Sequence, residues 1–593
     1  MAGVLALFLL LTSSSVMVAY SQSNGTSAAP KVLTVPTNYP TIQSAINAAS
    51  AGDTVQVLAG NYTEQLFLNK SVSLVGAGAS STIINAPKHI VPDSSGLLWG
   101  VHVFQDATVN ISGFTFGPSL APAAQCTANN QATPCAMIGV EGGSSLNLSS
   151  SVIDYSYMTN GLLVGSFNPQ SIAHALVSNV DFELPASMVA SPVTFDGVYV
   201  TDASVLISRT NIVGQPTLAG DSDGVFLDAG STATISHDVI SGGVPIGAQY
   251  DDGVNLINAT IVSNTLRPTG LSHFGFVPSA AQGAIVFQSG SEANITSNTI
   301  IGGTNVLSGI EIGASNDPYG PTVASIVNNT ISDVLCTDLT SRPAGICGTN
   351  AFSQDQLPGV LVSPPSWVGE GSTIHFPPGF ASAGTHQDIH NTISITGNHI
   401  SETDSGIMLT GVENCCVVSD NVISNSTDYG IAAANGAFAF PNNNISGGPY
   451  GATAIAGLAN TTVTLPGSEI QGTTTAPLFP QSQSNYVAKI VLNETTLSSP
   501  TTTTTTASTT TTSSLTMTTT AASTTTTSIQ TTTPTASSAT TTSSTQSTTS
   551  GAVPEFPLPL PAVTVLVVLV AVSYLAARSR IRKRTRPKVL EFF

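Results

Sequence analysis

Residues 295–300 read ITSNTI: an apolar residue, two others, Asn, one more residue and a second apolar residue. This pattern returns at intervals of roughly 22 to 36 residues, with one longer interval, which is typical of solenoid repeats. Its Asn recurs at Asn264, Asn298, Asn329, Asn398, Asn421 and Asn443, and earlier copies carry Thr210 or Asp238 there. The recurrence predicts a fold that brings equivalent residues of successive repeats together.

A second pattern alternates with the first: a polar residue, Gly, an apolar residue, any residue and another apolar residue, as in DGVFL at 223–227. Runs such as ISITGNHI at 393–400 alternate apolar and polar residues, which predicts strands with one buried face. No helical pattern separates these runs, so a doubly wound sheet is excluded. A hairpin-built sandwich would not return the same polar residue at the same point of every repeat. We therefore expect an all-β parallel β-helix over residues 32–490, with a long insertion at 333–390.

Stacking of successive coils about 4.8 Å apart would place each pattern Asn over the next, so that their amides form a hydrogen-bonded ladder. An open solenoid end needs a cap. The segment TIQSAINAAS at 41–50 predicts a capping helix over the first coil, because its apolar residues share one helical face: Ile42, Ala45, Ile46 and Ala49.

The stretch VPTNYPTIQSAINAASAGDTVQVLAGNYTEQLFLNKSVSLVGAGASSTIINA at 35–86 resembles the opening of pectin-lyase-like proteins. These include pectin methylesterases and the NosD-type β-helix proteins. The resemblance implies a right-handed parallel β-helix, and the repeats extend it to about residue 450. It does not imply one activity, because this opening segment is shared across activities.

Both ends of the chain predict export and anchoring. Residues 1–21 are typical of a signal peptide, although no Lys or Arg precedes the apolar run and an uncleaved anchor is the alternative. Residues 495–550 are almost entirely Thr and Ser, which predicts a disordered, O-glycosylated stalk. The apolar run 558–577 predicts one transmembrane helix, and residues 578–593 a basic cytoplasmic tail.

These segments predict a cell-surface, single-pass protein with an extracellular N-terminal region and a cytoplasmic C-terminus. The sequence PEF at 554–556, followed by the apolar run and basic tail, resembles the PEF-type C-terminal sorting signals of archaeal surface proteins. That resemblance implies that the helix is removed and replaced by another anchor.

The charge balance limits the partners. The chain has 14 Lys and Arg against 33 Asp and Glu, and seven of the basic residues lie between Arg578 and Lys588. Such an acidic outer region repels nucleic acid and anionic lipid and favours cations or neutral glycans. We expect an extracellular polysaccharide or a surface glycoprotein as partner, the membrane through the C-terminal helix, and no nucleic acid.

The six cysteines fit an oxidising compartment. Spacing predicts the loop-closing disulfides Cys126–Cys135 and Cys336–Cys347, whereas the adjacent Cys415 and Cys416 are expected to be small buried strand residues, because a vicinal disulfide is strained. Several Asn-x-Ser/Thr sequons predict a glycosylated exterior, among them Asn61, Asn147, Asn294 and Asn425.

The Asp-Gly pairs are the main candidates for chemistry. Asp196, Asp223 and Asp252 occupy the same step of three consecutive repeats, so coils in register would bring their carboxylates close together. Three interpretations are open: a turn in which Asp bonds the local backbone and Gly supplies positive φ, a Ca²⁺ or other cation site, and a catalytic carboxylate pair. DSDGVFL and YDDGVNL also resemble the Asp segments of polygalacturonases, but where that family has His-Gly this chain has Gln282-Gly283, and no Arg-x-Lys follows.

Two other known mechanisms match less well. A pectate-lyase-like reaction needs Ca²⁺ and a basic residue, for which Arg267 is the candidate beside Arg209; a solvated corner residue is the other interpretation of Arg267. The pectinesterase motifs are present only as fragments, FQDATV at 104–109 and VDFELP at 180–185.

The segment HQDIH would place His386, Asp388 and His390 on one face of a strand, as a Zn²⁺ or Cu²⁺ site requires; a polar loop edge is the alternative. Trp367, in the same insertion, is a candidate for stacking on a glycan. No cofactor is required by the sequence, and Ca²⁺ is the one that the acidic column would bind.

Together these features predict an anchored β-helix protein that binds extracellular glycan or a surface partner, with a role in adhesion or the cell envelope. The alternatives are a polysaccharide lyase or glycoside hydrolase that uses the acidic face, and NosD-like metal handling.

Overall fold

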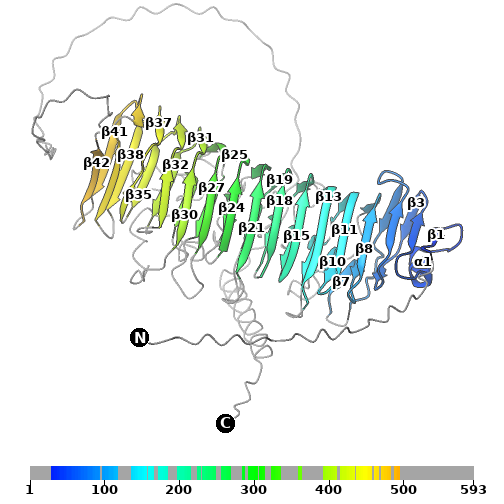
Figure 1. Ribbon diagram of the computed structural model, residues 1–593. Coiled ribbons are helices and arrows are strands. Elements are labelled where there is room, and N and C mark those ends of the chain that lie inside the picture. Colours follow the sequence, from blue (N-terminus) through cyan, green and yellow to red (C-terminus); the bar gives the residue numbers. More distant parts are fainter. Residues whose placement is uncertain are drawn as a thin grey trace, which may run out of the picture. The chain divides into compact units, whose positions relative to one another are not determined.

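A computed structural model describes residues 29–493 except for short gaps. The gaps are 94–95, 118–134, 157, 166–170, 185–195, 215–222, 229, 249–255, 269–282, 288–290, 305, 307, 314–321, 336–357, 364–390, 411–414, 435, 457–459, 467–468 and 483–485. The described residues form strands that stack coil upon coil along one axis, with the single helix α1 at the N-terminal end (Figure 1).

The strands form two long sheets and one short one, and every strand pairing is parallel. Three strands form the short sheet: β36 (Ala437–Ala439), β39 (Thr461–Pro466) and β42 (Ala488–Asn493). Fourteen form the second sheet: β4 (Leu66–Leu68), β7 (Leu98–Val103), β10 (Cys135–Glu141), β12 (Asn160–Gly165), β14 (Asp196–Thr201), β17 (Asp223–Leu227), β20 (Val244–Ala248), β23 (Gly283–Phe287), β26 (Ser308–Gly313), β29 (Pro358–Ser363), β32 (Ser405–Thr410), β35 (Tyr429–Ala434), β38 (Tyr450–Ala456) and β41 (Ala476–Ser482).

Twenty-five strands form the largest sheet: β1 (Val32–Val35), β2 (Thr54–Val57), β3 (Gly60–Thr63), β5 (Ser73–Gly76), β6 (Thr82–Asn85), β8 (Thr108–Ser112), β9 (Thr115–Gly117), β11 (Ser145–Asp154), β13 (Ala173–Glu183), β15 (Ala203–Ser208), β16 (Asn211–Val213), β18 (Thr232–Ser236), β19 (Val239–Gly242), β21 (Ile257–Val262), β22 (Thr265–Pro268), β24 (Ser291–Thr296), β25 (Thr299–Thr304), β27 (Val323–Val327), β28 (Thr330–Leu335), β30 (Thr392–Thr396), β31 (His399–Ser401), β33 (Cys416–Ser419), β34 (Val422–Ser424), β37 (Asn444–Ser446) and β40 (Ile470–Gln471). Each strand pairs with its equivalent in the next coil, as the repeats predict. The arrangement is that of a parallel β-helix and is consistent with the right-handed form.

The core is a set of stacked apolar columns inside the coils. Val198 on β14 pairs with Val225 on β17, and Val225 pairs with Ile246 on β20; all three are fully buried in one continuous apolar cluster. Because each coil buries its apolar face only against its neighbours, the columns run on from coil to coil as one dry interior.

The predicted Asn ladder is present in the structure. All six Asn side chains are buried, and each of the first five donates from its Nδ2 to the Oδ1 of the next, as in Asn298 to Asn329 at 3.0 Å. The last, Asn443, donates to the Val418 and Pro441 carbonyls instead. The backbone amide of Asn298 donates to the same oxygen at 2.9 Å, and its Nδ2 also donates to the Ile261 carbonyl. The residue before each ladder position has positive φ, as Ser263 and Ser297 do, so the tight turn of the coil lies here.

The helix α1 (Ile42–Ala48) lies where the amphipathic pattern predicts it. Thr41 and Ser44 form a capping box, and the Glu64 carboxylate accepts hydrogen bonds from the first helical amides, those of Ile42 and Gln43. Ile42, Ala45, Ile46 and Ala49 are buried, and the helix contacts β1, β2 and β4. Its function as a cap remains a prediction.

The prediction of one continuous insertion at 333–390 is wrong. This segment contains β29 (Pro358–Ser363), which pairs with β26 and β32 and completes a coil. The sequence PGVLV at 358–362 follows the Gly pattern of the other coils. The extra residues of this coil therefore lie on both sides of a regular strand.

The expectation for Cys415 and Cys416 is also wrong, since the two form a vicinal disulfide. Successive side chains of a strand point to opposite faces, which would keep two adjacent sulfurs apart. Strand β33 begins at Cys416, so Cys415 lies before the strand and is not bound by this alternation. Cys135 is disulfide-bonded, while Cys126, Cys336 and Cys347 lie outside the described residues.

In the part of the chain that the structure describes, no helix is long and apolar enough to cross a membrane. The predicted signal peptide at 1–21, the stalk at 495–550, the span at 558–577 and the tail at 578–593 all lie outside it.

Candidate functional site

The fourteen-stranded sheet has an outer face, which is the face turned away from the core. Along β14, Val198 and Val200 belong to the core, whereas Tyr199 packs with Trp99, Ala136 and Leu163 in a separate cluster. Ala136 of this outer cluster pairs with Asn160, and Asn160 pairs with Asp196. The residue that precedes the strand glycine, as Asn160 and Asp196 do, therefore lies on the same outer face. The outer face therefore carries the polar residue of each Gly pattern and the residue between its two apolar positions.

Asp196 and Asp223 lie side by side on this face. Val198 pairs with Val225, which puts the two Asp at equivalent positions of adjacent strands, and both are buried. The backbone amide of Asp223 donates to Asp196 Oδ1 at 3.1 Å. The Asp223 carboxylate lies against Gly247 of the next coil, where any Cβ would meet Asp223 Oδ2. Two carboxylates thus share one column, as predicted.

Of the three interpretations of Asp-Gly, the turn with positive φ at Gly is wrong for these two pairs. Asp196 and Asp223 are the first residues of β14 and β17, and the positive-φ residues of the described chain do not include Gly197 or Gly224. Glycine is required here by close approach instead: a Cβ on Gly197 would lie 2.5 Å from Ile212 Cγ2 and 2.6 Å from the Gly224 carbonyl oxygen.

The other members of the predicted catalytic set do not join this pair. In the coil after Asp223 the equivalent position is Val244, and Asp252 lies outside the described residues. Arg267 is on β22 of the larger sheet with an exposed side chain, and it pairs with Ser241. The only ion pair among the described residues joins His102 to Glu141, so Arg267 has no carboxylate partner there.

Sequence reasoning missed Glu311, which lies on the outer face of β26 between two core isoleucines. It is buried, and Ser308 Oγ donates to its Oε2 at 3.4 Å. Burial raises the pKa of Glu311 to about 7, and the Ser308 hydroxyl only partly opposes this. The signal was present in SGIEI at 308–312, where an acid stands between the two apolar residues of the Gly pattern.

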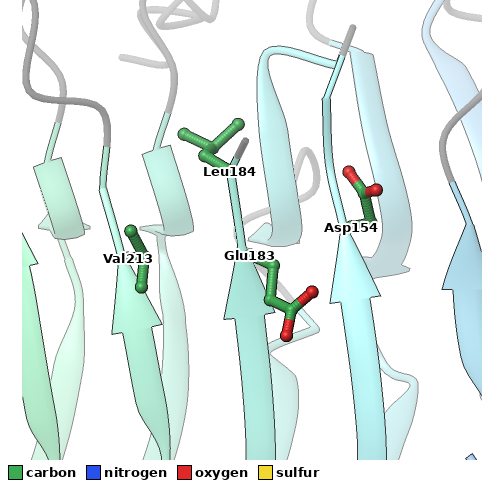
Figure 2. Close-up of a pocket in the computed structure, with 4 residues that line it drawn as sticks. All are labelled: Asp154, Glu183, Leu184 and Val213. Atoms are coloured by element: carbon green, nitrogen blue, oxygen red, sulfur yellow. The ribbon is translucent and has the colours of Figure 1, made fainter. Parts of the chain in front are cut away.

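A second acidic arrangement lies in the larger sheet, where an open pocket is lined by Asp154, Glu183, Leu184 and Val213 (Figure 2). Asp154 ends β11 and Glu183 ends β13, and the two residues pair directly. Asp154 Oδ1 accepts from the Ser156 amide at 3.0 Å. The pocket offers two neighbouring carboxylates but no basic group among its lining residues.

Aromatic rings lie at several points on the outer face of the fourteen-stranded sheet. Tyr199 and Phe226 on adjacent strands have ring centroids 5.4 Å apart, and the Tyr199 hydroxyl donates to Asp228 Oδ2 at 2.7 Å. Near the C-terminal end, Tyr450 and Phe479 stack with centroids 4.6 Å apart and are partly exposed.

In that second group Tyr429 stacks on Tyr450 at 5.4 Å, and both pack with Met408 and Ala432 in a cluster apart from the core. Sequence reasoning missed both aromatic groups, because each ring comes from a different coil.

Several predicted site residues lie outside the described residues: His386, Asp388, His390 and Trp367. The four predicted glycosylation sites are described and exposed, so their side chains are accessible to modification: Asn61, Asn147, Asn294 and Asn425. The modification itself remains a prediction.

Comparison with known proteins gives a family match over part of the chain. A sequence profile of the periplasmic copper-binding protein (NosD) family matches residues 372–529, which is less than half of the chain. The chain is a parallel β-helix protein. A search of curated proteins finds no match to its sequence.

Solved structures with a similar fold have low sequence identity to this chain. The catalytic domain of a GH87 α-1,3-glucanase in complex with tetrasaccharides is 12% identical, with a TM-score of 0.36 over 77% of this chain and 69% of that one. A mannuronic acid specific family 6 polysaccharide lyase from human gut microbiota is 11% identical, with a TM-score of 0.36 over 77% and 92%. A pectin methylesterase in complex with a hexasaccharide is 13% identical, with a TM-score of 0.25 over 62% and 89%.

Proposed function

We propose that this chain is an extracellular glycan-binding protein, anchored at the cell surface, and that the outer face of the fourteen-stranded sheet is its binding face. The observation that carries the proposal is the partly exposed stack of Tyr450 on Phe479. Both rings present a flat apolar surface, which suits the apolar face of a sugar, and the Tyr450 hydroxyl can bond a sugar hydroxyl. A second aromatic pair, Tyr199 and Phe226, lies on the same sheet, so a polymer could contact the face at more than one point.

Charge indicates the class of glycan. The chain has a formal net charge of −19, and the same face carries Asp196, Asp223 and Glu311. These three groups are buried, so they act on a ligand through their negative charge, which repels uronates. A neutral polysaccharide is therefore the preferred ligand, and binding of a uronate polymer would require a bridging cation such as Ca²⁺.

A glycan array probed with the full-length protein, followed by calorimetry with the best ligand, tests the proposal. Tyr450→Ala should weaken binding about tenfold or more, because it removes one face of the aromatic stack. Tyr486→Ala is the matched control, since Tyr486 is an exposed tyrosine that precedes β42 and lies off this sheet. Equal affinities of the two variants, or no glycan bound by the wild type, would exclude this binding face.

The alternative is a polysaccharide-active enzyme that uses the same face. One observation favours it: the carboxyl group of Glu311 has a pKa raised to about 7, which suits a general acid. Incubation of the array ligands with the protein, with product analysis by mass spectrometry, separates the two. Product formation that is lost in Glu311→Gln would favour the enzyme, and unchanged ligand would favour binding.

A further inference from the structure

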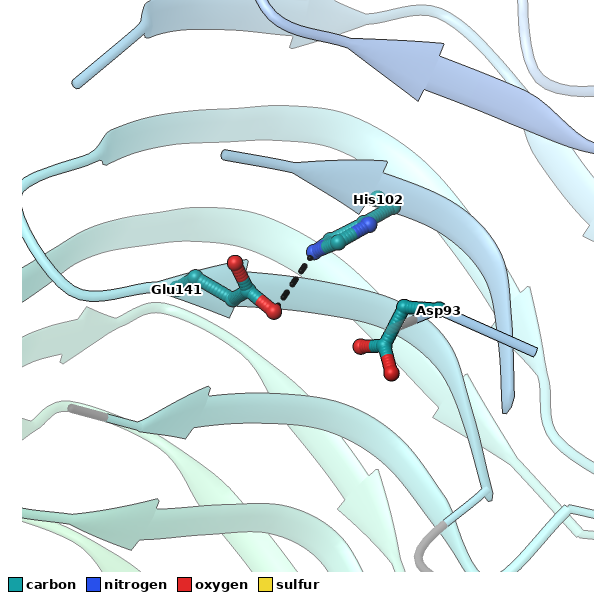
Figure 3. Close-up of side chains that lie close together, drawn as sticks. All are labelled: Asp93, His102 and Glu141. Atoms are coloured by element: carbon teal, nitrogen blue, oxygen red, sulfur yellow. Dashed lines mark ion pairs between the residues drawn. The ribbon is translucent and has the colours of Figure 1, made fainter. Parts of the chain in front are cut away.

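Three potential metal ligands meet near the N-terminal end of the outer face: Asp93, His102 and Glu141 (Figure 3). His102 is on β7, Glu141 ends the neighbouring strand β10, and Asp93 lies in the segment before β7. One ligand atom from each residue lies within 4.8 Å of the others. None of the predicted site residues belongs to this group, so it is a separate candidate.

The imidazole of His102 has an unsatisfied nitrogen. His102 is only 3% exposed, and its Nε2 has no hydrogen-bond partner. Nε2 nevertheless lies 3.1 Å from Glu141 Oε1, a distance that suits either an ion pair with a protonated imidazole or a cation shared by a neutral imidazole and the carboxylate. A buried polar atom without a partner is destabilising, and a cation bound to both groups would supply the missing partner.

The ligands are held in place by their neighbours. Asp93 Oδ1 accepts from the Leu97 amide at 2.9 Å, and Asp93 Oδ2 accepts from Trp99 Nε1 at 2.7 Å. The His102 ring lies between the rings of Trp99 and Phe104, with centroid distances of 5.2 and 4.5 Å. Hydrogen bonds and packing of this kind orient the ligands of metal sites.

From this geometry we propose that Asp93, His102 and Glu141 bind a divalent transition-metal cation, with Zn²⁺ as the representative ion. One imidazole nitrogen with two carboxylate oxygens suits Zn²⁺ and related ions, whereas Ca²⁺ prefers oxygen ligands alone. The Glu141 side chain is 28% exposed, so an ion is accessible from solvent on that side. Three protein ligands leave a coordination position for water or for an outside ligand.

The inference is independent of the proposed glycan binding, because it rests on the first coils of the face and not on Tyr450. The test uses the full-length protein, treated with a chelator and titrated with Zn²⁺ in a calorimeter. His102→Phe keeps a planar ring between Trp99 and Phe104 and removes the ligand nitrogen. This variant should bind one equivalent of Zn²⁺ fewer than the wild type. The test compares the two proteins because the predicted cluster around His386 could bind an equivalent of its own in both.

Two further variants sharpen the test. Glu141→Gln should weaken this equivalent about 10- to 100-fold, since it removes a charged ligand. His174→Phe is the matched control, because His174 is exposed on β13 of the other sheet, and it should leave the stoichiometry unchanged. Full stoichiometry in His102→Phe, or no saturable Zn²⁺ binding by the wild type, would overturn the proposal.

A spectroscopic measurement covers the case in which a variant folds poorly. The chain has two tryptophans, so in a Trp367→Phe background Trp99 is the only tryptophan, and excitation at 295 nm selects it over the tyrosines. Cu²⁺ bound beside His102 should quench Trp99 fluorescence at stoichiometric concentration. Quenching that needs a large excess of Cu²⁺, in a protein with an intact melting transition, would contradict the site.

Discussion

Asp238 Oδ1 accepts a hydrogen bond from the Thr210 backbone amide at 2.7 Å, as the oxygen of each ladder Asn accepts one from the preceding coil. Asp238 thus occupies a ladder position, and its own amide donates to Asn264 Oδ1 at 2.9 Å. Its second oxygen, Oδ2, is buried without a hydrogen-bond partner. At the equivalent atom Asn264 donates to the Ile235 carbonyl, which a deprotonated carboxylate cannot do.

This position makes stability depend on pH. Burial raises the pKa of Asp238 to about 7, although the Thr210 and Ser236 amides oppose the shift. Because the folded state holds the proton more tightly than the unfolded state, stability is fully present at about pH 4 and falls as pH rises to about 7. Asp238→Asn should stabilise the protein by about 1–3 kcal/mol at pH 8 and flatten this slope, as measured by urea unfolding across pH. A variant with an unchanged slope would contradict the protonated ladder position.

Removal of one rung should weaken the stack. Asn329→Ala removes the side-chain acceptor of the Asn298 backbone amide and the side-chain donor to the Ile295 carbonyl. It also removes one of the two donors to Asn398 Oδ1. We expect a loss of about 2–5 kcal/mol in the free energy of unfolding. Asn294→Ala, at an exposed position of β24, is the control and should change it by less than about 0.5 kcal/mol. Equal effects of the two variants would show that the ladder contributes little.

Gly197 should not tolerate a side chain, because its Cβ would lie 2.5 Å from Ile212 Cγ2. Gly197→Ala should lower the melting temperature by several degrees through strain between adjacent coils. Gly303→Ala is the matched control, since its nearest neighbour would be the Pro268 carbonyl oxygen at 3.8 Å. A well-tolerated Gly197→Ala would mean that close approach between adjacent coils is not the reason for glycine at this position.

Glu311 should titrate near neutrality. Carbon-13 NMR of selectively labelled glutamate should show one carboxyl signal that moves near pH 7 and is absent in Glu311→Gln. Since burial raises this pKa above the unfolded value, Glu311 also makes stability fall as pH rises from about 4 to about 7. A signal that titrates near the ordinary value would mean that water reaches this carboxyl group.

The fold could be predicted from sequence because its determinants are local and repeated. The six ladder Asn and the strand periodicity appear at fixed spacings, and parallel stacking is the one arrangement that brings them together. The positions of the turns were harder to predict. Asp-Gly is typical of a turn, yet here the residue with positive φ is the one before each ladder Asn. Glycine is required at Gly197 because a side chain would clash with the adjacent coil, and sequence alone does not show that contact.

The candidate sites could be predicted less well, because they depend on register between coils. Asp196 and Asp223 were assigned to one column correctly, since the Gly pattern marks both. The same pattern extended to WGVHV at 99–103 would have placed His102 on the outer face. Glu141 and Asp93 are not part of a Gly pattern, so the sequence does not indicate that they lie beside His102.

The rung between Asn329 and Asn398 spans 69 residues, whereas that between Asn398 and Asn421 spans 23, and the hydrogen bonds are 3.0 and 2.9 Å long. The hydrogen-bond geometry of the ladder therefore does not depend on the number of residues in the coil that contains β29. A foreign epitope or reporter peptide inserted into the sequence on either side of β29 should therefore leave the hydrogen bonds of the ladder intact.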